Sequence, residues 1–355
     1  MIEISRYVLA AIVAQTHLWP QGPDGPGQIS VFAFYTLSGY LMTRVLNERY
    51  GFSIRGTVAF ALNRVLRLWP AYLAIMILVL VALKVWPLQN FFFLIRTPAN
   101  AADVVTTAVV IGQVGFDFVQ WLPLAKPLVT SWSLSIEICC YLLLVLYFAR
   151  SPARLWAFAG IGIVAMALST GWCVISANPA AYGPYCFQNR YGIIQAGFVP
   201  LALGGLYYFR RAAIAAWLAQ HRLASIICFL AALMAMFGSE FFRTTAGPFI
   251  GIPVMWMLLS LSHGRPPTNV GDFFGRPSYH LFIAHMPVAA VLFSALHFPA
   301  NTLLIYLATV LAALGLSGIL VPMERRINDV RRQIAAAALD GAPVNRAALN
   351  ARPLR

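Results

Sequence analysis

Apolar runs about as long as a membrane-spanning helix recur along almost the whole chain. A helix needs roughly 20 apolar residues to cross the hydrocarbon core of a bilayer. Hydrophobic residues make up 60% of the 355 residues and charged residues only 10%, which disfavours a water-soluble protein. The sequence therefore predicts an all-α, polytopic membrane helical bundle of about ten transmembrane helices. The predicted spans are 4–19, 29–47, 69–86, 129–148, 156–175, 191–209, 222–240, 245–262, 277–297 and 301–321.

The basic residues indicate how the chain is oriented in the membrane. The formal net charge is +14, but Lys and Arg gather in short loops between apolar runs, which is typical of cytoplasmic loops and not of a nucleic-acid-binding surface. With ten spans and a cytoplasmic N-terminus, 20 of the 25 Lys and Arg lie inside. An eleventh span at 103–122 would leave only 9 inside. We therefore predict cytoplasmic termini, no nucleic-acid partner, and a re-entrant or interfacial segment at 103–122.

The domain organisation follows from the same pattern. Residues 1–322 form the predicted transmembrane domain, and residues 323–355 form a basic cytoplasmic tail that begins as an amphipathic helix near anionic lipid. Cys173 and Cys186 flank a predicted outward loop, where an oxidising compartment permits a disulfide that the spacing alone does not establish. No metal-ligand spacing occurs, so no metal site is predicted.

The first apolar run carries an arginine at its start and a histidine near its end. On an α-helix, Arg6 and His17 are separated by about 16 Å of rise and by only about 20° from whole turns, so both side chains point the same way. Between them the residues are almost wholly apolar, and both side chains are expected to face protein and not lipid. This suits a path through the bilayer, with a cation near one mouth and a proton acceptor deeper in. Alternatively, Arg6 is an interfacial anchor and His17 a cap.

Two further polar groups lie next to or within apolar runs. Arg64 and Arg67 are three residues apart on a predicted cytoplasmic helix, so both can reach one polyanion unless they serve only topology. Glu137, the only carboxylate placed inside a predicted span, lies four residues after Ser133 on the same face, toward the outward end of that span. At that depth it is either a structural partner of a neighbouring polar group or a proton acceptor.

The stretch RPSYHLFIAHMPV, residues 276–288, carries a tyrosine and two histidines in the ninth predicted span. His280 and His285 are about 140° apart around a helix, so they are not expected to face the same cavity. For His280 alone, a buried and hydrogen-bonded core role is the simpler expectation.

Taken together, these stretches resemble acyltransferase family three, bacterial membrane proteins that modify carbohydrates and some antibiotics. The resemblance covers nearly the whole chain, although His280 stands where the family usually has a serine. In chain order the similar features are the spacing of Arg6 and His17, FYTLSGYL (34–41), the R-x-x-R pair Arg64 and Arg67, WSLSIE (132–137) and SYHLFIAHMPV (278–288).

The resemblance implies a membrane-bound O-acyltransferase of the bacterial cytoplasmic membrane. Acyl-CoA, most simply acetyl-CoA, would be a co-substrate, with no tightly bound cofactor. The acceptor would be a hydroxyl of a glycan or similar molecule at the outer side, which arrives by itself or is presented by a separate protein. A multi-pass transporter of a small anion or lipid-linked glycan is the alternative, and a scaffolding subunit is a third.

The resemblance also implies roles for individual residues. His17 would take the proton of the acceptor hydroxyl or carry the acyl group transiently, and the sequence does not separate these two routes. Glu137 or Ser133 would orient the imidazole or the acceptor. The remaining implied contacts are to acyl-CoA by Arg6, Arg64 and Arg67, and to substrate by His285 and Tyr279.

Overall fold

The structure, a computed structural model, describes residues 2–21, 26–92, 95–110, 127–176, 191–238, 246–262 and 277–339, together with residues 273 and 275. Within these ranges all regular structure is helical, which confirms the predicted all-α class. The α-helices are α1 (Ile2–Leu18), α2 (Pro26–Val45), α3 (Ile54–Val85), α4 (Ala101–Val109), α5 (Ser131–Leu146), α6 (Pro152–Ser176), α8 (Phe198–Gln220), α9 (Arg222–Gly238), α11 (Gly251–Ser262), α13 (Pro277–Leu296) and α14 (Leu303–Leu339).

Each of the ten predicted apolar runs overlaps a helix, but the helices differ in length. Among the described residues, the helices Ile194–Gln220 and Arg222–Ala232 meet at an angle of 86°. They add one span only if this bent pair is counted as a single span. The protein is a multi-pass membrane protein, whereas the number of ten crossings remains a prediction. In the part of the chain that the structure describes, five helices are long and apolar enough to cross a membrane: Pro26–Tyr50, Ile54–Val85, Pro152–Cys173, Pro277–Leu296 and Leu303–Ile334.

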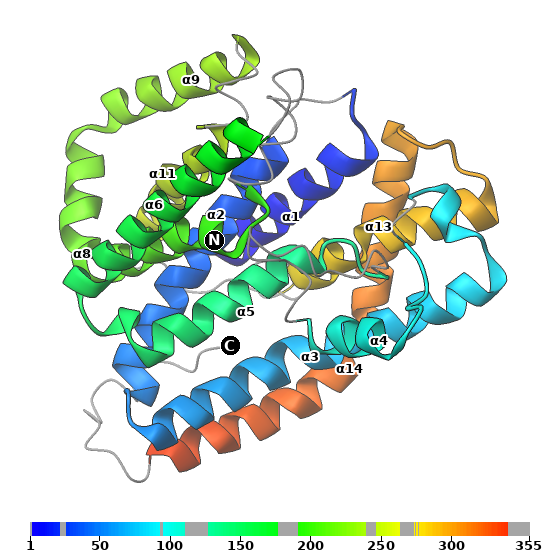
Figure 1. Cartoon of the computed structure of the whole chain (residues 1–355), viewed down its shortest axis with the longest axis horizontal. Coiled ribbons are helices and arrows are strands. Elements are labelled where there is room, and N and C mark those ends of the chain that lie inside the picture. Colours follow the sequence, from blue (N-terminus) through cyan, green and yellow to red (C-terminus); the bar gives the residue numbers. More distant parts are fainter. Residues whose placement is uncertain are drawn as a thin grey trace.

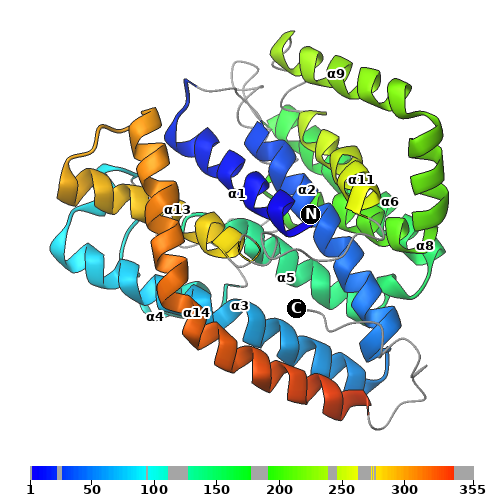
Figure 2. The same cartoon turned by 180° about the vertical axis from the view of Figure 1, so that it is seen from behind.

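Helix α5 occupies the middle of the molecule (Figures 1 and 2). On one side of it α3 and the C-terminal half of α14 run side by side, and on the other lie α2, α6, α8 and α11. Helix α1 packs on both α2 and α13. The first helix of the chain is therefore in contact with one of the last, and α5 separates the two flanks.

The contact between α2 and α8 depends on glycines. A Cβ added at Gly39 would lie 2.0 Å from the carbonyl oxygen of Leu201, and one added at Gly204 would lie 1.9 Å from that of Thr36. Small residues let helix backbones approach closely in membrane proteins. Gly39, which belongs to the FYTLSGYL stretch, therefore has a packing role.

Two helices extend well beyond the apolar runs that predicted them. Helix α3 begins at Ile54, where the Ser53 hydroxyl accepts a hydrogen bond from the Gly56 amide and caps the first turn. Helix α14 continues without a break to Leu339, so the predicted boundary between residues 322 and 323 lies inside a helix. The division into a domain and a tail remains a prediction, but the start of the tail packs along α3.

The predicted re-entrant or interfacial segment at 103–122 is described only to residue 110. Its first part is α4, which is held against α3 by two hydrogen bonds, from Tyr72 Oη to Thr107 O (2.6 Å) and from Trp69 Nε1 to Ala108 O (3.0 Å). Of the predicted disulfide pair, Cys173 is disulfide-bonded, and Cys186 lies outside the described residues.

Candidate active site

Two histidines from opposite ends of the chain meet inside the bundle. His17 Nδ1, in the last turn of α1, lies 3.1 Å from His285 Nε2 on α13, and the rings stack with centroids 5.2 Å apart. His285 is fully buried, whereas His17 is exposed. Because His285 is the ninth residue of the 20-residue α13, the end of α1 meets α13 near its middle. His17 therefore lies deeper along the bundle than its place at the end of α1 suggests.

Backbone carbonyls determine which nitrogen of each ring carries the proton. His285 Nδ1 lies 2.9 Å from Phe282 O and 3.2 Å from Leu281 O. A carbonyl oxygen only accepts, so the neutral His285 ring carries its proton on Nδ1 and offers a lone pair at Nε2. That lone pair accepts a hydrogen bond from the Nδ1–H of His17. The free lone pair of His17 is then on Nε2, which leaves this nitrogen available to act as a general base.

His280 points elsewhere, as the helical spacing predicted. Its Nδ1 is 2.9 Å from Ser317 Oγ and its Nε2 is 3.1 Å from Glu324 Oε1, both on α14. The side chain is fully buried. The expectation that His280 is a hydrogen-bonded core residue is therefore confirmed.

Glu137 lies apart from the histidine pair. Its Oε1 accepts hydrogen bonds from Ser38 Oγ of α2 and from Tyr141 Oη one turn later on α5. It is also within electrostatic range of Arg6 and Arg64. Glu137 thus lies near the arginines, and its place toward the outward end of its span remains a prediction.

Ser133 is hydrogen-bonded at the start of its own helix. Its hydroxyl donates to Thr130 O (2.9 Å), and its side chain is almost completely buried. The described contacts of the His17 ring are with His285 and with the backbone of Val13. The start of α5 nevertheless contacts α13 one turn from His285, where Thr130 Oγ1 donates to Phe282 O (3.1 Å). That Ser133 or Glu137 orients the imidazole or the acceptor remains a prediction.

The three predicted donor-binding arginines do come together. Arg67 of α3 is within electrostatic range of both Arg6 of α1 and Arg64 of α3, and all three side chains are half-buried. None of the three forms an ion pair with a carboxylate in the described part of the chain. Half-buried guanidinium groups without a carboxylate partner are suited to an anionic ligand.

Tyr279 belongs to the arginine group as well. Its hydroxyl donates to Leu68 O (2.9 Å) on α3, and the ring is within electrostatic range of Arg67 and Glu137. Apart from Ser133, the predicted site residues therefore separate into an arginine group and a histidine pair. Arg6 and His17 mark the two along α1, about 16 Å apart along its axis.

Comparison with known proteins agrees with this pattern of residues. A family model described as an acyltransferase domain matches residues 4–321, a range that contains both groups. The chain belongs to acyltransferase family three. Family membership makes it a membrane-bound transferase of acyl groups. No curated protein and no solved structure gives a significant match.

The sequence did not predict several residues that contact Glu137 or the arginine group. Ser38 lies within the FYTLSGYL stretch and Tyr141 follows Glu137 by one helical turn, so both carried a local signal. Asn63 and Arg331 carried no such local signal. They are 268 residues apart in sequence, yet Arg331 Nη2 donates to Asn63 Oδ1 (3.1 Å) beside Arg64.

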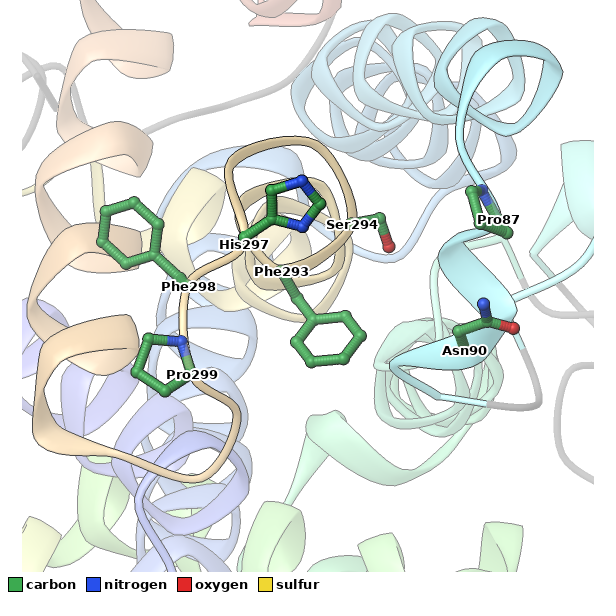
Figure 3. A pocket seen from close by; sticks show the side chains of 7 residues that line it. All are labelled: Pro87, Asn90, Phe293, Ser294, His297, Phe298 and Pro299. Carbon is green, nitrogen blue, oxygen red and sulfur yellow. The ribbon is translucent and has the colours of Figure 1, made fainter.

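The described part of this acyltransferase also has an open pocket at the C-terminal end of α13 (Figure 3). Its volume is about 430 Å³, and it is lined by Pro87, Asn90, Phe293, Ser294, His297, Phe298 and Pro299. Phe293 follows His285 by two turns of α13, or about 12 Å. The pocket thus contains none of the predicted site residues. No cluster of side chains suited to a metal ion occurs within the described ranges.

Proposed function

We propose that this acyltransferase moves an acyl group, most simply acetyl, from cytosolic acyl-CoA to a hydroxyl of a glycan or similar acceptor. The acceptor is modified at the outer side of a bacterial cytoplasmic membrane, in which both termini are cytoplasmic. The single observation that supports this most strongly is the histidine pair. It leaves His17 Nε2 with a free lone pair on an exposed ring, while His285 holds Nδ1.

The donor is held by charge at one end of α1. Acyl-CoA carries a diphosphate and a further phosphate, which match Arg6, Arg64 and Arg67. Its acyl arm then extends along α1 toward His17, a distance of about 16 Å or roughly half of the ~30 Å hydrocarbon thickness. Glu137, hydrogen-bonded by Ser38 and Tyr141, balances part of the arginine charge before the donor arrives.

The transfer step uses His17 as a general base. Its Nε2 takes the proton of the acceptor hydroxyl while the oxygen attacks the thioester carbonyl. The new C–O bond forms, the C–S bond breaks, and the CoA thiolate receives the proton back from the imidazolium. His285 accepts the Nδ1 hydrogen bond throughout and so keeps the ring oriented. Attack by His17 Nε2 itself, through an acyl-histidine, uses the same geometry.

The test is turnover with defined substrates. The purified full chain in proteoliposomes is given acetyl-CoA and a glycan extract, free CoA is measured through its thiol, and the glycans are weighed by mass spectrometry. We expect CoA release that depends on the acceptor, and glycans heavier by one acetyl group. A protein that neither releases CoA nor modifies any glycan, but moves an anion or a glycan across the vesicle wall, would favour a transporter.

A further inference from the structure

A fourth arginine joins the arginine group from the far end of the chain. Arg331, on the C-terminal part of α14, donates from Nη2 to Asn63 Oδ1 (3.1 Å), and Arg64 Nη2 donates to the same oxygen (2.9 Å). Asn63 is buried, and its own amide nitrogen reaches Arg331 O (3.5 Å). One neutral amide oxygen thus holds two guanidinium groups side by side.

These two guanidinium groups retain donors that the protein does not use. The Nε atoms of Arg64 and Arg331 are both buried and have no hydrogen-bond partner. Neither residue forms an ion pair within the described ranges, although Glu324 and Glu137 lie within electrostatic range. Like charges brought together with unused donors are costly unless an anion binds between them.

The arrangement also includes Arg67, which is within electrostatic range of Arg6, Arg64 and Arg331. Three helices, α1, α3 and α14, therefore supply four arginines. Figure 1 shows α14 running beside α3, and Arg64 and Arg331 of these two helices meet at Asn63. Among the described residues, three carboxylates, Glu3, Glu137 and Glu324, are within electrostatic range of these arginines. Four guanidinium groups spread over three helices suit a ligand whose phosphates are spread along its length.

We propose that Arg331 is a ligand-binding residue of the donor site, and that the part of α14 beyond residue 322 forms one wall of it. This inference rests on the proposed function and names the phosphates of acyl-CoA as what Arg331 contacts. The segment predicted as a cytoplasmic tail near lipid is, in this view, part of the active protein.

The experiment compares three variants of the full chain in nanodiscs by calorimetric titration with CoA. Arg331→Gln removes the charge, and Asn63→Asp places a carboxylate where it neutralises Arg64 and Arg331. Arg332→Gln is the matched control, because Arg332 is exposed and paired with Asp329 on the same helix. Thermal unfolding of each variant shows that it is folded.

For Arg331→Gln we expect CoA affinity to fall roughly 10-fold or more, because one charge-assisted hydrogen bond to phosphate is lost. Asn63→Asp should also weaken CoA binding while its unfolding temperature stays the same or rises, which a purely structural role would not produce. Arg332→Gln should bind CoA as the wild type does. Wild-type affinity in folded Arg331→Gln would overturn the assignment of Arg331.

Two further arms separate the possible sources of phosphate. If Arg331 serves CoA, its substitution weakens CoA binding equally in nanodiscs of phosphatidylcholine and of phosphatidylglycerol. A loss seen only with the anionic lipid would overturn the inference and assign Arg331 to a lipid headgroup. A wild-type protein that does not bind CoA at all would instead refute the proposed function, so the two failures are distinguishable.

Discussion

Replacing His285 tests whether the histidine pair acts as one unit. His285→Leu keeps a buried apolar side chain of similar size but removes the Nε2 acceptor that lies 3.1 Å from His17 Nδ1. The two carbonyls that accept from His285 Nδ1, of Leu281 and Phe282, belong to α13 itself and keep their places in the helix. Stability should therefore change little, and the effect should fall on the orientation and tautomer of His17.

The size of the effect follows from the lost hydrogen bond. A net hydrogen bond contributes about 0.5–1.5 kcal/mol, and each ~1.4 kcal/mol of barrier is tenfold in rate. Loss of this bond alone slows transfer by roughly 2- to 13-fold. The backbone hydrogen bond of His17 with Val13 remains and still limits the ring, so we expect an effect within this range. The KM for acyl-CoA should not change, because the arginine group lies about 16 Å away along α1.

The assay is the initial rate of CoA release in proteoliposomes, with acceptor glycan in excess. His285→Gln supplies an amide oxygen that accepts a hydrogen bond from His17 Nδ1. This variant should recover most of the rate. His280→Ser is the matched control on the same helix, because His280 contacts α14 and not His17. A His285→Leu protein with wild-type turnover, or a glutamine variant no faster than the leucine variant, would refute the reasoning.

Three other predictions concern the base, the donor and the sidedness of the reaction. His17→Ala should lower turnover roughly 10²- to 10⁴-fold while CoA affinity is kept, measured by CoA release and calorimetry; near wild-type turnover would exclude His17 as the base. Arg64→Ala combined with Arg67→Ala should weaken CoA binding, with a smaller loss at high salt because the contact is charge on phosphate, and unchanged affinity would leave these residues a topological role. In sealed vesicles of known orientation, acyl-CoA on the cytoplasmic face should acylate an impermeant acceptor on the opposite face, and modification only when both share the cytoplasmic face would contradict the transmembrane scheme.

The helices were predictable because a bilayer imposes a strict length on apolar runs. What hydropathy could not predict is where a helix continues into polar sequence. The predicted third span begins at residue 69, yet α3 begins at Ile54, because the cap at Ser53 satisfies the first turn of the helix without any need for lipid. In the same way α14 continues to Leu339 through a segment rich in alanine and arginine.

Local spacing predicted part of the site and no more. The single helix joining Arg6 and His17 and the divergence of His280 from His285 both follow from 3.6 residues per turn. The neighbours of Glu137 did not follow, because Ser38 of α2 and the arginines of α1 and α3 come from helices whose packing has no signal in local spacing. Contacts between distant segments, such as that of His17 with His285, have no periodic signal in a single sequence.

Both ends of the site join parts of the chain that are 268 residues apart: His17 to His285, and Asn63 to Arg331. During synthesis the N-terminal helices leave the ribosome first, so His17 and the first arginines enter the membrane long before their partners exist. The nascent protein is therefore expected to be catalytically silent until α13 and α14 have been inserted. If Arg331 is part of the donor site, a chain truncated before it would enter the membrane without one wall of that site.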